Sequence, residues 1–199
     1  MGDLIGPLIQ DAKLSLDFKM ETSDVPSSGD NLEYVAKVKG LGEYKISLNT
    51  FALEKKRGAF ALFAKVSEVM GESFSPFVEP ILPIISEHMR FEYSKEIRKS
   101  ALDTFDNILE AIGEPRNVNL FQEAFPMYLE QLQKYLARKN SETIADLLTA
   151  LRNNLRTLSR KNEQNRQFLT QTQIEMLGPI IKASLEIVNE LKAEFSASL

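Results

Sequence analysis

Carboxylate and amide side chains recur on one face of three segments that have the apolar periodicity of helices. At 100° per residue, the face opposite the apolar positions collects Glu68 and Glu72, then Asp103, Asp106, Asn107 and Glu110, and then Glu142, Asp146 and Asn153. Carboxylates pair with Lys or Arg side chains, and an Asn amide can both donate to and accept from the backbone of an extended peptide. The pattern favours a surface for a basic, extended segment. The alternative is an ordinary solvated face, because most helices carry charge on their exposed side.

Residues for covalent or metal chemistry are sparse. The chain contains no Cys and a single His, so a zinc ligand set is missing. His88 falls among Ile81, Ile84 and Ile85 at helical spacing, which predicts a partly buried imidazole with satisfied hydrogen bonds rather than a ligand or base. No nucleophile, base and orienting group occur together. We therefore expect no catalytic residue, no metal, no cofactor and no enzymatic activity.

Two other short motifs have weak functional interpretations. The Gly40-Leu41-Gly42 stretch lacks the strand–loop–helix setting and the further glycines of a phosphate loop, so it predicts a turn. The Lys55-Lys56-Arg57 run places three cations on successive helical residues, which spread over about 200° and do not form one patch for nucleic acid. We expect these cations to be solvated.

The segment from Ser75 to Pro115 contains the elements that would position the acidic face. Its first half predicts a helix with an apolar stripe of Phe77, Val78, Ile81, Leu82, Ile85 and Met89. Its second half predicts another, with Ile97, Ala101, Leu102, Phe105, Ile108, Leu109 and Ile112. The connector is short enough only for an antiparallel return, and Gly113 and Pro115 stop the second helix. A helix pair with surplus apolar surface must stack on neighbours, as in an α-solenoid.

The same pair recurs along the chain. We expect an all-α superhelix with a first repeat at 1–71, a second at 75–113, a third at 118–160 and a trailing first helix of a truncated fourth repeat at 171–197. Residues 19–49 would interrupt the first repeat. Within them, 19–31 is polar and aperiodic and predicts irregular chain, whereas 32–49 predicts either a small hairpin or an ordered loop. Thr50 and Ser141 are the expected N-caps of the helices that follow them.

Composition sets the class of protein. The chain has 199 residues, is 43% hydrophobic and carries a net charge of −4. No apolar run approaches the ~18 residues needed to cross a bilayer, and Met1-Gly2-Asp3 lacks a secretory signal. We expect an intracellular protein that begins within a solenoid, binds no membrane and makes no direct contact with nucleic acid. The acidic balance fits a receptor for basic partners.

Several details resemble HEAT repeats. Pro83 and Pro126 fall inside predicted first helices, where a proline ordinarily costs about 3 kcal/mol. Ile97-Arg98 followed by Ala101 resembles the signature of a HEAT second helix, and the resemblance implies that Arg98 bridges neighbouring repeats.

The order of segments also resembles one family. The insertion, Lys45-ISLNT, Leu53-EKKRGAF, Phe77-VEPILPII and Glu96-IRKSALDTF occur in the order found in the middle-to-late part of the importin-5-like (importin beta-3) branch of the karyopherin-beta family. The insertion departs from the family pattern because it holds few acidic residues.

The resemblance implies a nuclear transport receptor without covalent chemistry. Such a receptor wraps basic cargo carrying a nuclear localisation signal on its concave second helices, where the acidic and amide residues above would bind it. It passes nuclear pores by contacting phenylalanine-glycine nucleoporins, and it releases cargo to the GTPase Ran. The implied location is cytoplasm, nucleus and nuclear pore. The alternative is a HEAT scaffold subunit of a phosphatase or kinase assembly with no transport role.

Overall fold

The computed structural model describes residues 2–14, 19–22, 31–38, 42–162 and 168–197. The chain divides into two compact units, Met1–Phe63 and Ala64–Leu199, which we describe in turn. Helix α2 (Thr50–Met70) begins in the first unit and ends in the second.

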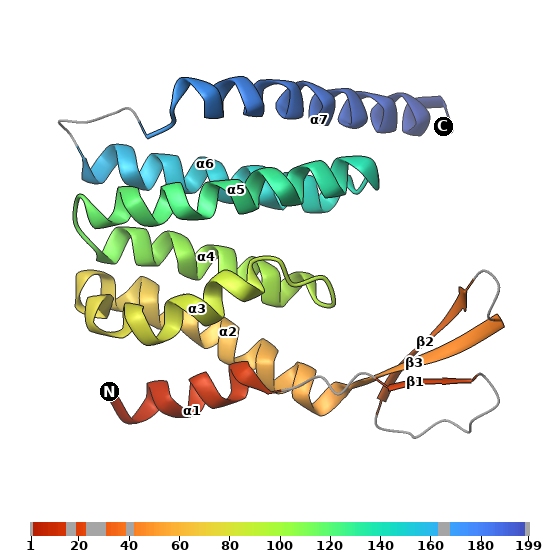
Figure 1. Ribbon diagram of the computed structural model, residues 1–199, viewed down its shortest axis with the longest axis horizontal. Helices are drawn as coiled ribbons and strands as arrows, with labels where there is room; N and C mark the ends of the chain where they lie inside the picture. Colours follow the sequence, from red (N-terminus) through yellow and green to blue (C-terminus); the bar gives the residue numbers. More distant parts are fainter. Residues whose placement is uncertain (1, 15–18, 23–30, 39–41, 163–167, 198–199) are drawn as a thin grey trace. The chain divides into compact units, whose positions relative to one another are not determined.

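The first unit contains helix α1 (Gly2–Lys13), a small sheet and the start of α2. The sheet has strands β1 (Lys19–Thr22), β2 (Asn31–Val38) and β3 (Gly42–Asn49) in the antiparallel order β1-β3-β2 (Figure 1). Pairing of Tyr34 with Ile46 fixes the register of β2 against β3. Of the two alternatives for 32–49, the hairpin is therefore correct, and its connection at 39–41 lies outside the described residues.

The expectation of irregular chain over 19–31 is wrong for its first four residues and for Asn31, which begins β2. Lys19–Thr22 pairs with the second edge of β3, from Lys19 opposite Ser47 to Thr22 opposite Tyr44. A two-stranded hairpin is marginal in water, and a third strand satisfies the backbone groups of β3 on both sides. The segment is too short to show a period of two, so this pairing left no signal in the local sequence. Residues 23–30 lie outside the described part of the chain.

A buried lysine ties α1 to α2 within this unit. Lys56 is 5% exposed and donates to the carbonyl oxygen of Ala12. The expectation that all three cations of the 55–57 run are solvated is thus wrong for Lys56. Its neighbours do lie on other sides of the helix: Lys55 is 4.0 Å from Asp11, and Arg57 is 3.0 Å from Glu54. The apolar core here consists of Ile5, Ala12, Ala52, Leu53, Ala59, Phe60 and Phe63.

The second unit is a stack of helices (Figure 1). After α2 come the 3₁₀ segment η1 (Gly71–Phe77), α3 (Val78–His88), α4 (Lys95–Ala111), α5 (Arg116–Ala137), α6 (Ser141–Lys161) and α7 (Gln171–Ala197). The helices α3 and α4 pack together, as do α5 and α6, and α4 packs on α6. The predicted all-α superhelix of paired helices is confirmed, while the division into repeats at 1–71, 75–113, 118–160 and 171–197 stays a prediction.

Helix ends follow local capping chemistry. Gly71 follows the end of α2 and has a φ of +50, which glycine adopts without a Cβ penalty. Two caps lie one residue before the predicted ones: Asn49 Oδ1 accepts from Ala52 N at 3.0 Å, and Asn140 Oδ1 accepts from Thr143 N at 3.0 Å. Thr50 and Ser141 are instead the first helical residues. Asn is at least as good a cap as Ser or Thr, so the preceding residue wins.

Repeat length distinguishes the kind of solenoid. Helix α2 begins at Thr50, α4 at Lys95 and α6 at Ser141, so successive starts are 45 and 46 residues apart. HEAT repeats run to about 40–47 residues, whereas TPR repeats have 34. The fold is a HEAT-repeat solenoid, and the predicted internal prolines Pro83 and Pro126 lie within α3 and α5.

The core of this unit is continuous from η1 to α7. Fully buried side chains include Phe74, Ile81, Ile85, Ile97, Phe105, Phe121, Phe125, Tyr128, Leu132, Leu147 and Leu158. His88 is 3% exposed, and its Nδ1 lies 2.8 Å from the carbonyl oxygen of Ile84. The imidazole is more deeply buried than expected, and its hydrogen bond is with the preceding helical turn.

Candidate functional site

The exposed side of α4 and α6, with residues 64–72 beside α4, forms one polar surface that we call the second-helix face. Helices α4 and α6 make the most extensive helix–helix contact in the described chain. On α4, Asp103, Asp106, Asn107 and Glu110 follow at i, i+3, i+4 and i+7, so they share one stripe. The apolar stripe on the opposite side of α4, with Ile97 and Phe105, is buried in the core, so the polar stripe faces outward.

Three carboxylates act on the charge of Asp103. We call Glu68, Asp103, Asp106 and Asp146 the acidic cluster. Protein atoms around the carboxyl group of Asp103 raise its pKa, and the negative charges of the other three raise it further, against the lowering effect of Lys99. Asp103 is exposed and makes no hydrogen bond or ion pair with the described residues. A cation placed here would relieve both the burial cost and the mutual repulsion.

Asp146 has a second feature that suits a cation. Its Oδ2 atom is buried and accepts no hydrogen bond from the described part of the chain. The nearest cation is Lys95, whose Nζ lies 3.9 Å away and also binds Glu142. A buried carboxylate oxygen without a donor is costly, and a lysine near the exposed part of this carboxyl group would offset that cost.

Glu68 and the predicted carboxylates outside the acidic cluster are paired with cations of the chain itself. Glu110 binds Arg160 and lies 3.9 Å from Lys161, and Lys161 binds Glu72 at 2.8 Å. Glu68 pairs with Lys65 at 2.9 Å on the same helix. The second-helix face is therefore not a uniform row of free carboxylates, which the sequence pattern alone had suggested.

The two predicted amides, Asn107 and Asn153, differ in how far their hydrogen-bonding groups are already used within the chain. The Nδ2 atom of Asn107 donates to Ala64 O and to Ser67 Oγ, each at 3.0 Å, and so joins α4 to the end of α2. Its predicted role as a reader of peptide backbone rests on the carbonyl oxygen alone. Asn153 is half-buried and lines a pocket beside Asp106. Its role in binding stays a prediction.

Asp106 belongs to a buried polar chain that sequence reasoning missed. The hydroxyl of Tyr128 donates to Asn154 Oδ1 at 2.7 Å, and Asn154 Nδ2 donates to Asp106 Oδ1 at 3.1 Å. Burial raises the pKa of Asp106, while hydrogen bonds from Asn154 and Thr157 lower it in part. The expectation that Asp106 simply faces solvent is wrong. The signal was two polar residues, Asn154 and Thr157, one turn apart within the apolar stripe of α6.

The hydrogen bonds around Asp106 give a measurable pKa prediction. Thr157→Val keeps the side-chain volume but removes a donor that favours the ionised carboxylate, so we expect the pKa of Asp106 to rise further. At neutral pH the free energy of unfolding should fall by about 1.5–3 kcal/mol, the usual range for a hydrogen bond to a charged group. A carboxyl-carbon NMR titration measures the pKa.

The sign of the pH effect follows from the direction of the shift. Since the pKa of Asp106 is higher in the folded than in the unfolded chain, ionisation of this group costs stability as pH rises through that interval. The Thr157→Val penalty should therefore shrink below the folded pKa, where Asp106 is protonated. Ser159→Ala, at an exposed position on the same helix, is the control and should leave the pKa of Asp106 unchanged. An unchanged pKa in Thr157→Val would contradict the hydrogen bond.

Arg98 joins two helix pairs. Its guanidinium donates to Phe91 O at 3.0 Å and to Thr143 Oγ1 at 3.1 Å, and it lies 5.7 Å from the ring centroid of Tyr135. The side chain, 5% exposed, thereby links the start of α4 to α6 and α5. This is the geometry that an inter-repeat bridge requires. Its contribution to stability stays a prediction.

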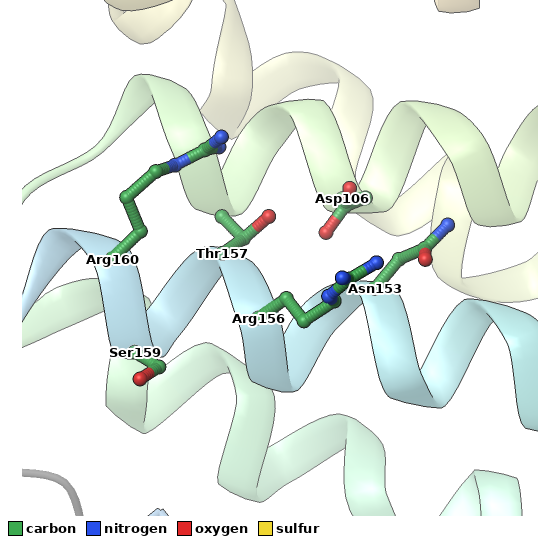
Figure 2. A pocket seen from close by; sticks show the side chains of 6 residues that line it. All are labelled: Asp106, Asn153, Arg156, Thr157, Ser159 and Arg160. Carbon is green, nitrogen blue, oxygen red and sulfur yellow. The ribbon is translucent and has the colours of Figure 1, made fainter.

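The second unit has at least two pockets. The first has a volume of about 540 Å³ and lies over α6 beside Asp106 (Figure 2). The second, about 210 Å³, lies between α3 and α5 and is largely apolar, with Leu82, Met89, Phe105, Leu120, Ala124 and Met127 among its lining residues.

Within the described chain, no group of three or more His, Cys, Asp or Glu side chains is placed to hold a metal ion. The described helices include none long and apolar enough to cross a membrane.

Comparison with solved structures supports the fold. Kap121p bound to RanGTP superposes with a TM-score of 0.76 at 18% sequence identity, covering 96% of this chain and 18% of that one. Kap121p bound to the extreme C-terminus of the protein phosphatase Cdc14p gives 0.77 at 18% identity, covering 96% and 18%. Kap121p bound to Nup53p gives 0.75 at 16% identity, covering 97% and 19%. The chain thus spans under a fifth of the length of these structures.

Sequence comparison supplies the family. Comparison with curated proteins returned no significant match. The family described as "IPO5-like, TPR repeats" matches residues 47–165, more than half of the chain. That description names TPR repeats, whereas the 45- and 46-residue spacing of the helix starts corresponds to HEAT units; both are stacked antiparallel helix pairs. This HEAT-repeat chain belongs to the IPO5-like family of the karyopherin-beta (importin-beta) proteins.

Proposed function

We propose that the chain is a segment of a nuclear transport receptor and that its second-helix face binds a lysine-bearing segment of a cargo protein. The acidic cluster is the observation that carries this proposal. Asp103 is exposed, carries no partner in the described chain and is surrounded by three further carboxylates. Asp146 adds a buried oxygen without a donor. A lysine ammonium offers three donors and a charge, which suits both groups.

The partners follow from the relatives. Structures of Kap121p carry RanGTP, Nup53p and the extreme C-terminus of Cdc14p. We therefore propose that the whole receptor binds basic cargo with a nuclear localisation signal, contacts phenylalanine-glycine nucleoporins and is controlled by the GTPase Ran. It would work in cytoplasm, nucleus and nuclear pore, as a non-enzymatic binding protein.

The groove between α3 and α5 suits the nucleoporin part of this proposal. It is lined mainly by residues of the first helices, and Leu82, Met89 and Met127 give it a flexible apolar lining. Met side chains adapt to varied apolar partners and favour contact with aromatic rings. A phenylalanine side chain is the expected occupant.

An affinity capture with the full receptor tests the proposal. Basic proteins should be retained by the parent and released on addition of Ran locked with GTP, whereas the nuclear and cytoplasmic distribution of the receptor should depend on its nucleoporin contacts. The contrary result is that the same proteins are bound with and without GTP-locked Ran and that most of them are phosphatase or kinase subunits. That result would identify a scaffold and overturn the transport function.

A further inference from the structure

Three arginines follow one another along α6. Arg152, Arg156 and Arg160 are spaced by four residues, so they lie one turn apart on the same side of the helix, and all three are exposed. Arg160 forms an ion pair with Glu110 on α4. Arg156 makes no hydrogen bond or ion pair with the residues that the structure describes. It is a cation with five free donors, and Asp106 lines the same pocket.

Arg156 also lines a pocket, which Arg152 does not. The lining residues from α6 are Asn153, Arg156, Thr157, Ser159 and Arg160, and Asp106 closes the side toward α4. Figure 2 shows Arg156 reaching along α6 toward Asn153, below Asp106. Asn153 and Arg156 at i and i+3 thus present an amide and a guanidinium to the same space of about 540 Å³.

The charges around this pocket are unevenly matched. Glu110 neutralises Arg160, and the oxygens of Asp106 accept from Asn154 and Thr157. Arg156 is therefore the arginine of the pocket that has no ion pair within the described chain. A guanidinium in this position binds a carboxylate through two parallel hydrogen bonds.

We propose that the pocket at Arg156 and Asn153 binds the carboxylate of a glutamate or aspartate in the same segment whose lysine enters the acidic cluster. This inference rests on the proposed function and adds a second specificity element to it. A polyanion such as nucleic acid does not fit, since Glu68, Asp103, Asp106 and Asp146 would repel its other phosphates. A segment with one cation and one anion matches both signs.

Helix geometry sets the spacing between the two charges. Asp106 lies at both the cluster and the pocket, with Asp103 one turn before it on α4. The two subsites are then one to two helical turns apart, roughly 5–10 Å, which an extended peptide crosses in about two to three residues. The recognised pattern is a lysine followed or preceded at that distance by an acidic residue.

Fluorescence anisotropy with two synthetic peptides tests the pattern. The peptides share one lysine and differ only in carrying Glu or Gln three residues from it. The Glu peptide should bind the chain roughly three- to fivefold more tightly, the upper range for one exposed ion pair. Arg156→Gln should abolish this preference, and Arg152→Gln, which removes the same charge outside the pocket, should keep it. Measurable binding that is equal for the two peptides, or equal effects of the two substitutions, would overturn the inference.

A second measurement separates this inference from the function on which it rests. Titration with inorganic phosphate, followed by the NMR signals of the arginine Nε–H groups, should shift Arg156 saturably and leave Arg152 little changed. If phosphate binds in this way and neither peptide does, the anion pocket stands and the cargo function fails. If the lysine peptides bind but phosphate moves Arg152 and Arg156 alike, the cargo function stands and the pocket is refuted.

Discussion

Phe105→Ala is expected to lower the free energy of unfolding by about 3–5 kcal/mol, the usual cost of removing a buried aromatic ring. Phe105 is 1% exposed and lies at the centre of α4, where it also borders the groove between α3 and α5. The truncation leaves a cavity shared by three helices. Because stability in a solenoid passes between nearest neighbours, we expect the loss to spread to both adjoining helix pairs.

A matched truncation provides the control. Phe51→Ala removes the same ring from a position that is 68% exposed, so chemical denaturation should register only a small change. Equal midpoints for Phe105→Ala and the parent chain would show that the apolar stripe of α4 is not core.

Reversing the two exposed carboxylates of the acidic cluster is expected to weaken a lysine-rich peptide roughly tenfold at low salt. In the variant Asp103→Lys with Glu68→Lys, two attractions become repulsions, each worth about 0.2–1 kcal/mol or somewhat more on reversal. The loss should shrink as salt screens the charges. The parent affinity should also fall as pH decreases through the raised pKa of Asp103, since the protonated carboxyl no longer attracts lysine.

Asp106 and Glu110 are left unchanged in this test because they contribute to the fold. Asp106 accepts from Asn154, and Glu110 binds Arg160, so their reversal would break contacts between α4 and α6. The control is Glu87→Lys with Glu175→Lys, which changes the net charge equally at exposed positions on α3 and α7. If both double variants weaken the peptide alike, only overall charge matters and the cluster is not a site.

Periodicity was sufficient for the helical architecture. Apolar residues at three- and four-residue spacings predicted α3 to α7, and Pro83 lies inside α3 as expected. The apolar stripe of a helix is visible in the sequence of that helix alone, which explains why these helices could be predicted. The caps at Asn49 and Asn140 were displaced by one residue because Asn, Ser and Thr compete for the same role.

Long-range pairing could not be predicted in the same way. Strand β1 forms by pairing with β3, and the buried ammonium group of Lys56 donates a hydrogen bond to Ala12 O, which lies 44 residues away in the sequence. The second-helix face shows the same limit. Its stripe of carboxylates was visible in the sequence, but Lys95, Arg160 and Lys161 approach from neighbouring elements and neutralise part of it. Which carboxylates remain open depends on this tertiary pairing.

An NMR titration of the isotope-labelled chain with a lysine-rich peptide tests the central claim most directly. The largest saturable shifts should fall on Asp103, Asp146 and their neighbours on α4 and α6, and they should diminish at high salt. Shifts confined to α3 and α5, or none at peptide concentrations that saturate the full receptor, would show that the second-helix face does not bind basic cargo.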